Sequence, residues 1–175
     1  WVAFPYTADL AHLVYNAQRI ETPPITWDEF LASGLPWLFV IGDSKGGASD
    51  AVLSQYLSAG GDFATNTSDR WLSQEPLIRL LEFYETAHVE GLIPPQALNL
   101  TDVDAVWPFY LSDDVPIIQS QARRYLAERH ALASSGYAPL PTKDGEPLTL
   151  ARGWGLALVT NDAQRQQAAL RFINW

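Results

Sequence analysis

Residues 36–42 read Pro36-Trp37-Leu38-Phe39-Val40-Ile41-Gly42, and they indicate the class of fold. Trp37 to Ile41 form a continuous apolar run between a proline and a glycine, which is the pattern of a buried strand. A glycine-rich loop over Gly42–Ser49 follows, and a helix is predicted from Asp50 to about Ala59, before Gly60-Gly61. A buried strand that leads through a loop into a helix is typical of an α/β domain.

Further elements are predicted on both sides of this stretch. Thr26 and Glu29 have the spacing of a capping box, so a helix should begin at Thr26 and run to about Ala32, with Gly34 beyond it. Asp9–Gln18 is interpreted as a short helix or an extended turn. The other predicted elements are strands at Trp1–Phe4 (ended by Pro5), Val115–Ser120, Tyr137–Leu140 and Trp154–Val159, and helices at Glu75–Val89, Asp102–Trp107, Gln121–Arg129 and from a cap at Asn161 through Phe172.

The alternation of strands and helices predicts a layered sheet with helices on its faces, in one domain over residues 1–175. Hydrophobic residues make up 47% of the 175 residues and charged residues 18%, an ordinary globular composition. The longest apolar runs, such as Leu35–Ile41, are too short to cross a bilayer. Because the chain has no methionine, Trp1 is not a native start, and both ends are expected to be cuts through a longer protein.

Charge and composition exclude several kinds of site. The net charge of −9 argues against a nucleic-acid partner, because phosphate binding needs clustered lysine and arginine. The absence of cysteine excludes disulfides, zinc–thiolate sites and thiol nucleophiles. Three scattered histidines without H-x-x-x-H spacing predict no metal site, and no sequence feature predicts a cofactor. Seven tryptophans and seven tyrosines offer faces that can stack on sugar rings, although most are expected in the core.

One motif allows two functional interpretations. Gly42-Asp43-Ser44-Lys45-Gly46 matches G-x-S-x-G between a strand and a helix, the context of the nucleophile elbow of an α/β-hydrolase. A serine hydrolase that uses Ser44 also needs a histidine, and neither His88 nor His130 follows a late strand, where a triad histidine belongs. The preferred interpretation is a loop whose backbone N–H groups bind a polar ligand at the end of a strand, with Asp43 and Lys45 beside it. On this interpretation the protein is not an enzyme and has no catalytic residue.

Short motifs in a fixed order carry a family resemblance. The most specific is Pro23-Pro24-Ile25-Thr26-Trp27-Asp28-Glu29-Phe30, which resembles a P-P-x-T-W-D-E motif of family 1 extracellular solute-binding proteins of bacterial ABC importers, the maltose-binding-protein-like family. The match covers nearly the whole chain. Its other motifs are Phe4-Pro5-Tyr6-Thr7-Ala8-Asp9, Leu13-Val14-Tyr15-Asn16, Ser58-Ala59-Gly60-Gly61, Phe83-Tyr84 with Glu90-Gly91-Leu92, Ala138-Pro139-Leu140-Pro141 with Asp144-Gly145, Gly153-Trp154-Gly155-Leu156-Ala157-Leu158, and Ala168-Ala169 to Phe172.

The resemblance implies a three-layer α/β/α lobe of a periplasmic-binding-protein-like, type II fold. Residues 1–175 would be approximately the second lobe of a two-lobed protein that closes on its ligand about a hinge. The implied function is the extracytoplasmic solute-binding component of an ABC importer, in the periplasm or on the outer face of the cytoplasmic membrane, with a lipid anchor in a segment outside this chain. The implied partners are an ABC permease and a small solute, most often a carbohydrate.

The resemblance also places candidate ligand contacts. Tyr6 and Asp9 lie where the family has cleft residues just past the hinge strand, and the Gly42–Ser49 loop and the start of the Trp154 strand also face the cleft. The segment Asp113–Arg124 departs from the family pattern, so the resemblance assigns no contact to Gln119 or Gln121. In chemical terms, a tryptophan stacks on a sugar ring, carboxylates accept hydrogen bonds from hydroxyls, and basic side chains donate them. The predicted ligand-binding residues are Tyr6, Asp9, Asp43, Ser44, Lys45, Arg152 and Trp154.

Overall fold

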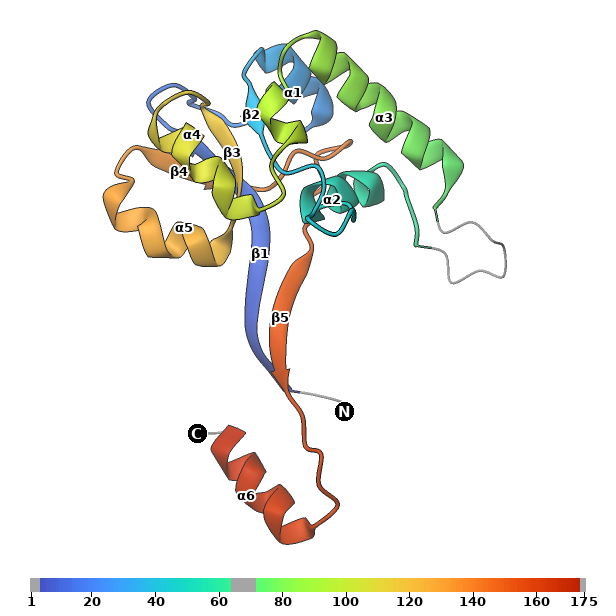
Figure 1. The fold of residues 1–175 in the computed structure, drawn as a ribbon, viewed down its shortest axis with the longest axis vertical. Helices are drawn as coiled ribbons and strands as arrows, with labels where there is room; N and C mark the ends of the chain where they lie inside the picture. The colour runs from blue at the N-terminus through green and yellow to red at the C-terminus, as the bar shows by residue number, and fades with distance from the viewer. Residues whose placement is uncertain (1–3, 64–71, 174–175) are drawn as a thin grey trace.

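A computed structural model describes residues 4–63 and 72–173, and its elements form an α/β lobe from which two long strands extend (Figure 1). The elements are β1 (Phe4–Asn16), α1 (Trp27–Ser33), β2 (Trp37–Leu38), α2 (Asp50–Ser58), α3 (Gln74–Val89), η1 (Pro95–Leu98), η2 (Val103–Val106), α4 (Trp107–Leu111), β3 (Ile117–Gln121), α5 (Ala122–Glu128), η3 (Arg129–Ala131), β4 (Ser135–Ala138), β5 (Ala151–Leu156) and α6 (Ala163–Ile173).

The sheet has the order β2-β3-β1-β4, and β5 pairs with the outer part of β1. β2 and β3 are parallel, whereas β1 pairs antiparallel with β3, β4 and β5. Residues 11–16 of β1 lie within the lobe, where α5 packs against β1 and β3. Residues 4–10 pair with β5 alone, and this two-stranded ribbon leaves the lobe and leads to α6 (Figure 1).

The interpretation of Asp9–Gln18 as a helix or a turn is wrong, because most of this segment belongs to β1. Ala11, Leu13 and Val14 are buried although neighbouring side chains of a strand point to opposite faces. Burial on both faces removes the alternation of apolar and polar residues that normally indicates a strand. Because β1 is central in the sheet, its sequence lacks the alternation that would have indicated a strand.

Pro5 does not end a strand as predicted, since it lies inside β1. The pairing with β5 is irregular between Pro5 and Thr7, and β5 is the only partner of this part of β1 among the described strands. A proline is tolerated on such an edge because no neighbouring strand requires its missing N–H. Residues 1–3, where the predicted Trp1–Phe4 strand mostly falls, lie outside the described residues.

The helix predicted at Thr26 is confirmed, with its caps. The Thr26 hydroxyl accepts the Glu29 N–H at 3.0 Å, and the Glu29 carboxylate accepts the Thr26 N–H at 3.2 Å, which completes the capping box. Gly34 ends the helix with φ 64°, a left-handed conformation that favours glycine. The helices predicted from Asp50, over Glu75–Val89 and over Gln121–Arg129 correspond to α2, α3 and α5.

The predicted Trp37–Ile41 strand is confirmed in its position but not in its length. Only Trp37 and Leu38 pair with β3, although burial continues through Val40. Aromatic rings fill the core next to this segment: Trp37 packs on Phe39 and Phe30, and Phe30 contacts Phe83 of α3. The apolar run therefore supplies core side chains beyond the end of the strand.

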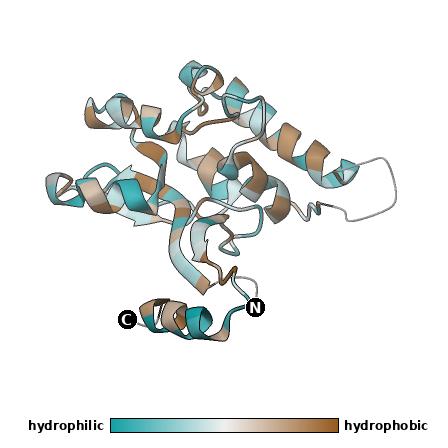
Figure 2. Ribbon diagram, turned by 60° about the horizontal axis from the view of Figure 1, so that its bottom comes forward, coloured by the Kyte–Doolittle hydropathy of each residue, from teal (hydrophilic) through white to brown (hydrophobic). Residues whose placement is uncertain are grey.

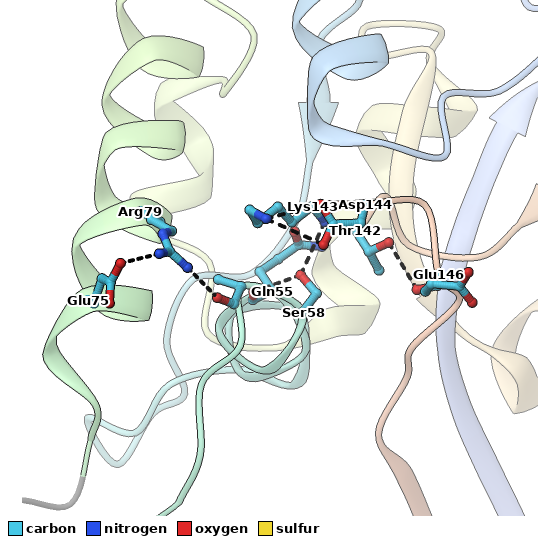
Figure 3. A network of polar contacts seen from close by, with 9 residues as sticks. Gln55, Ser58, Glu75, Arg79, Thr142, Lys143, Asp144 and Glu146 are labelled. Atoms are coloured by element: carbon cyan, nitrogen blue, oxygen red, sulfur yellow. Dashed lines mark hydrogen bonds and ion pairs between the residues drawn. The ribbon is translucent and has the colours of Figure 1, made fainter.

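A buried amide connects α1, α2 and the segment after β4. Gln55 of α2 has no solvent exposure; its Oε1 accepts the indole N–H of Trp27, and its Nε2 donates to the Pro141 carbonyl at 2.5 Å. Around it, Ser58 donates to the Gln55 carbonyl at 2.8 Å and accepts the Lys143 N–H at 3.4 Å (Figure 3). This network holds α2 in place and with it the loop that precedes the helix.

The far end of the ribbon and α6 stand apart from the lobe (Figures 1 and 2). No residue of α6 is buried, although apolar side chains occur along it, and Phe172 is exposed. The Asp162 carboxylate caps α6 by accepting the N–H groups of Gln164 and Arg165, which corrects the cap predicted at Asn161. Within the described residues, no helix combines the length and the apolarity needed to span a bilayer.

Candidate functional site

A polar pocket of about 320 Å³ opens where the parallel strands β2 and β3 end at their carboxyl sides. Carboxyl ends of parallel strands are the usual place of ligand sites in α/β sheets, because the following loops and helix N-termini converge there. The lining combines carboxylates, hydroxyls, amides and one guanidinium. Its residues are Val40, Asp43, Ser44, Ser49, Asp50, Thr101, Asp102, Val103, Gln119, Gln121 and Arg152.

One wall of the pocket is the Gly42–Ser49 loop, which Asp43 closes on itself. The Asp43 carboxylate oxygen Oδ1 accepts the N–H groups of Lys45 at 2.8 Å and Gly47 at 2.7 Å. These bonds, that of Gly47 first, lower the pKa of Asp43 below its ordinary value, because they favour the ionised form. Asp43 therefore shapes the loop with one oxygen and keeps the other beside the pocket.

An ion pair crosses from the ribbon to the pocket floor. Arg152 of β5 approaches Asp50, the first residue of α2, with Nε 2.6 Å from Oδ2 and Nη2 2.7 Å from Oδ1. The side chain of Asp50 is only 8% exposed. Such a two-point contact between a guanidinium and a carboxylate fixes the guanidinium plane as well as its distance. The contact raises the pKa of Arg152, so the Arg152 side chain remains positively charged.

The pocket continues onto one face of the ribbon. Asp9 lies opposite Arg152 and Thr7 lies opposite Trp154, and residues opposite each other in an antiparallel pair share a face of the sheet. The Trp154 side chain is unpacked, with 79% of the residue exposed. Between Arg152 and Trp154, a Cβ on Gly153 would lie 2.2 Å from the Thr7 carbonyl oxygen, so only glycine allows this close pairing. Trp154 thus stands beside the pocket on the same surface as Arg152.

The structure brings together only part of the predicted set. Asp43, Ser44 and Arg152 line the pocket. Asp9 lies beside it, where Oδ1 accepts the N–H of Arg123 at 2.8 Å. Tyr6 is exposed farther out on the ribbon, and Lys45 belongs to the loop but not to the lining.

Sequence reasoning did not find several lining residues. Asp50 was predicted only as the start of a helix, and Asp102 only as part of one, although both are polar residues at helix N-termini that follow loops. Gln119 and Gln121 also line the pocket, although the family pattern assigned them no contact. Polar residues in the otherwise apolar, fully buried strand β3 were the available signal, because a buried amide needs a partner.

Ser44 does not occupy a nucleophile elbow. In an elbow the serine turn leads directly into a helix, whereas here Gly42 pairs with Ala48 and α2 begins only at Asp50. No histidine lines the pocket among the described residues. His88 lies in the last turn of α3 and His130 lies in η3, and both are exposed. In the described part of the chain, the pocket lining therefore provides no histidine to act as a base for the Ser44 hydroxyl.

We therefore expect Ser44→Ala to leave ligand affinity within about threefold of wild type, since one solvent-accessible hydroxyl contributes little to binding. A fluorophosphonate probe should not label the protein, because an unactivated serine is a weak nucleophile. Mass spectrometry after incubation with the probe checks this. Stoichiometric labelling that disappears in Ser44→Ala would instead support the serine-hydrolase alternative.

A second, apolar hollow of about 610 Å³ lies between α5, β4 and residues 147–149. Leu10, Ala11 and His12 of β1 line it, whereas no residue of β1 lines the polar pocket. His12 packs edge-on against Tyr125 and Tyr137, and burial lowers its pKa. Within the described residues this hollow has few polar groups that could orient a solute.

The fold is an α/β lobe of the periplasmic-binding-protein-like type, with two strands that leave it as a ribbon. Comparison with solved structures confirms the fold. The chain is similar to maltose-bound MalE3 of T. maritima, with a TM-score of 0.70 and 19% identity over 98% of this chain and 49% of that one.

Two further structures show the same likeness. An ABC transporter solute-binding protein from Thermotoga lettingae TMO, bound with α-D-tagatose, has a TM-score of 0.67 and 21% identity over 97% of this chain and 48% of that one. A family 1 extracellular solute-binding protein from Bifidobacterium longum subsp. infantis has a TM-score of 0.64 and 20% identity over 98% and 50%. No protein-family model and no curated protein sequence matches the chain.

These comparisons confirm, at the level of the fold, the resemblance that the sequence motifs carry. The predicted three-layer α/β/α lobe is the lobe observed, and it is similar to one part of family 1 solute-binding proteins. The chain spans about half the length of each of these proteins.

Proposed function

We propose that the chain is the second lobe of a two-lobed, extracytoplasmic solute-binding protein of an ABC importer, and that the solute is a carbohydrate. The observation that carries the proposal is the polar pocket at the strand ends, with the exposed face of Trp154 next to it. The fold alone would not suffice, because one fold hosts many functions.

Each group of the site has a task in sugar binding. The free carboxylate oxygen of Asp43 and the carboxylate of Asp9, which also contacts Arg123, accept hydrogen bonds from sugar hydroxyls. Arg152 and Lys45 donate to ring or hydroxyl oxygens. Trp154 stacks on the apolar face of a sugar ring, and Tyr6 extends this aromatic surface along the ribbon. Ser44 contributes a hydroxyl at the rim. Together they recognise a solute that is polar at its edge and apolar on its ring face.

The ribbon suggests where the rest of the protein lies. β1 and β5 lead away from the lobe to α6, whose apolar residues are uncovered in this chain (Figure 1). In our proposal these strands are the hinge, α6 packs on the first lobe, and that lobe closes over the pocket. An ABC permease partner, a place outside the cytoplasmic membrane and a lipid anchor in a segment outside this chain belong to the same proposal.

Calorimetry on the intact protein with a panel of neutral mono- and disaccharides tests the proposal. We expect at least one sugar to bind, and residues 1–175 alone to bind it about tenfold more weakly or worse, because the contacts of the first lobe are missing. Equal affinity of lobe and intact protein would exclude closure between two lobes, and failure of every sugar would exclude a carbohydrate solute.

A further inference from the structure

The charges that line the polar pocket are unbalanced. Three carboxylates, from Asp43, Asp50 and Asp102, share the lining with one guanidinium, from Arg152. Asp43 and Asp102 each use Oδ1 in local backbone hydrogen bonds, the latter with the Asp104 N–H at 3.0 Å. Their second oxygens make no hydrogen bond within the part of the chain that the structure describes, so both remain as acceptors for a ligand.

The one positive charge is already paired. Asp50 contacts two nitrogens on one edge of the Arg152 guanidinium, at 2.6 and 2.7 Å, and the Asp50 side chain is almost completely buried. A buried carboxylate loses most of its hydration, and the contact with the guanidinium compensates for part of that loss. Breaking the pair would leave an uncompensated buried charge, so the pair resists separation. Arg152 can therefore direct its remaining N–H groups at a solute, but its net charge is cancelled by Asp50.

A buried amide adds a further acceptor. Gln121 is 8% exposed and lines the pocket; its Nε2 donates to Asp50 Oδ2 at 3.4 Å, and its Oε1 has no hydrogen-bond partner among residues 4–63 and 72–173. A buried acceptor without a partner is costly unless a ligand or a water molecule supplies a donor. The unpaired oxygen of Gln121 and the free carboxylate oxygens of Asp43 and Asp102 thus all need hydrogen-bond donors from the solute.

We propose that this half of the site selects solutes by charge: it accepts hydroxyl or ammonium groups and rejects carboxylate and phosphate groups. Asp50 is the positioning residue for this selection, because it orients Arg152 and cancels the charge that would otherwise attract an anion. The inference rests on the proposed function and narrows its solute class to neutral and amino-substituted sugars. An anion in the pocket would face the three carboxylates, while the cation of the lining, Arg152, is already paired with Asp50.

The first test compares sugars that differ only in charge. The intact protein, freed of ligand by unfolding and refolding, is titrated calorimetrically with glucose, glucosamine, glucuronate and glucose 6-phosphate, and with the corresponding galactose series. Neutral and amino members should bind at least about tenfold more tightly than their acidic counterparts, which is the effect of one unfavourable charge contact. An acidic or phosphorylated sugar that binds as tightly as its neutral counterpart overturns the inference while supporting a sugar-binding function.

The second test does not depend on which sugar binds. Inorganic phosphate is titrated into intact wild-type protein and into Asp50→Asn, which leaves the Arg152 charge uncompensated. We expect phosphate affinity to rise at least about tenfold in Asp50→Asn. Asp28→Asn, an equal change of charge at an exposed position of α1, is the control and should not raise it. Equal phosphate binding by Asp50→Asn and wild type would overturn the role of Asp50.

Asp102→Asn keeps the proposal testable if Asp50→Asn does not fold. Asparagine retains the cap of η2, because its carbonyl oxygen can still accept the Asp104 N–H, while one pocket charge is lost. This variant should raise phosphate affinity by about threefold, and an unchanged affinity counts against selection by charge. If no sugar binds but phosphate responds as expected, the proposed carbohydrate function fails and the charge selection stands.

Discussion

Replacing Gln55 with leucine lowers the free energy of unfolding by about 2–5 kcal/mol, because two buried groups lose their partners at a cost of about 1–3 kcal/mol each. The indole N–H of Trp27 and the carbonyl of Pro141 both bond to the Gln55 amide, and leucine of similar volume can replace neither contact. Chemical denaturation of the intact protein, followed by tryptophan fluorescence, measures the change.

Gln74→Leu is the matched control for this experiment, because Gln74 is an exposed residue in the first turn of α3. The control should change the free energy of unfolding by no more than about 0.5 kcal/mol. If Gln55→Leu is as stable as the control, the two hydrogen bonds of the buried Gln55 amide do not hold α2 in place.

Trp154→Ala weakens binding of the sugar identified by calorimetry by about 1–3 kcal/mol, or about 5- to 150-fold in Kd, if the indole stacks on a sugar ring. Because Trp154 is exposed in this lobe, its loss should leave the free energy of unfolding nearly unchanged. Trp154→Phe retains an aromatic face and should recover part of the affinity. Calorimetry on the intact variants measures all of these affinities.

Tyr137→Ala provides the control for a general loss of exposed aromatic surface. Tyr137 is also exposed, at 70%, but lies in β4 outside the polar pocket. The Tyr137→Ala variant should bind the sugar with wild-type affinity. Wild-type affinity in Trp154→Ala would mean that the ribbon face is not part of the site, even if the pocket is.

Elements with local signals were predictable, and the central strand of the sheet was not. The capping box at Thr26 and the proline-initiated helix over Glu75–Val89 depend on residues within one turn of each other, so their sequence suffices. β1 was misjudged because its partners β3, β4 and β5 lie far away in the sequence, and because its residues Ala11, Leu13 and Val14 are buried on both faces. Its strand conformation depends on that pairing rather than on its own pattern.

In the candidate site too, some features follow from local sequence and others from contacts between distant segments. Gly42-Asp43-Ser44-Lys45-Gly46 marks a loop at a strand end from local residues alone, and the two N–H bonds to Asp43 are local as well. The contact of Asp50 with Arg152 joins residues 102 positions apart, and it holds Arg152 in the pocket lining. Lys45, next to the motif serine, does not line the pocket.

Residue order alone was enough to establish the α/β class, the family resemblance and the loop that borders the pocket, because periodicity, caps and turn residues act over a few positions. The tertiary structure decided which polar residues share a pocket, which face of the ribbon continues it and which charge is already paired. These properties arise from contacts between distant segments, and their energies depend on burial, which exists only after the chain has folded.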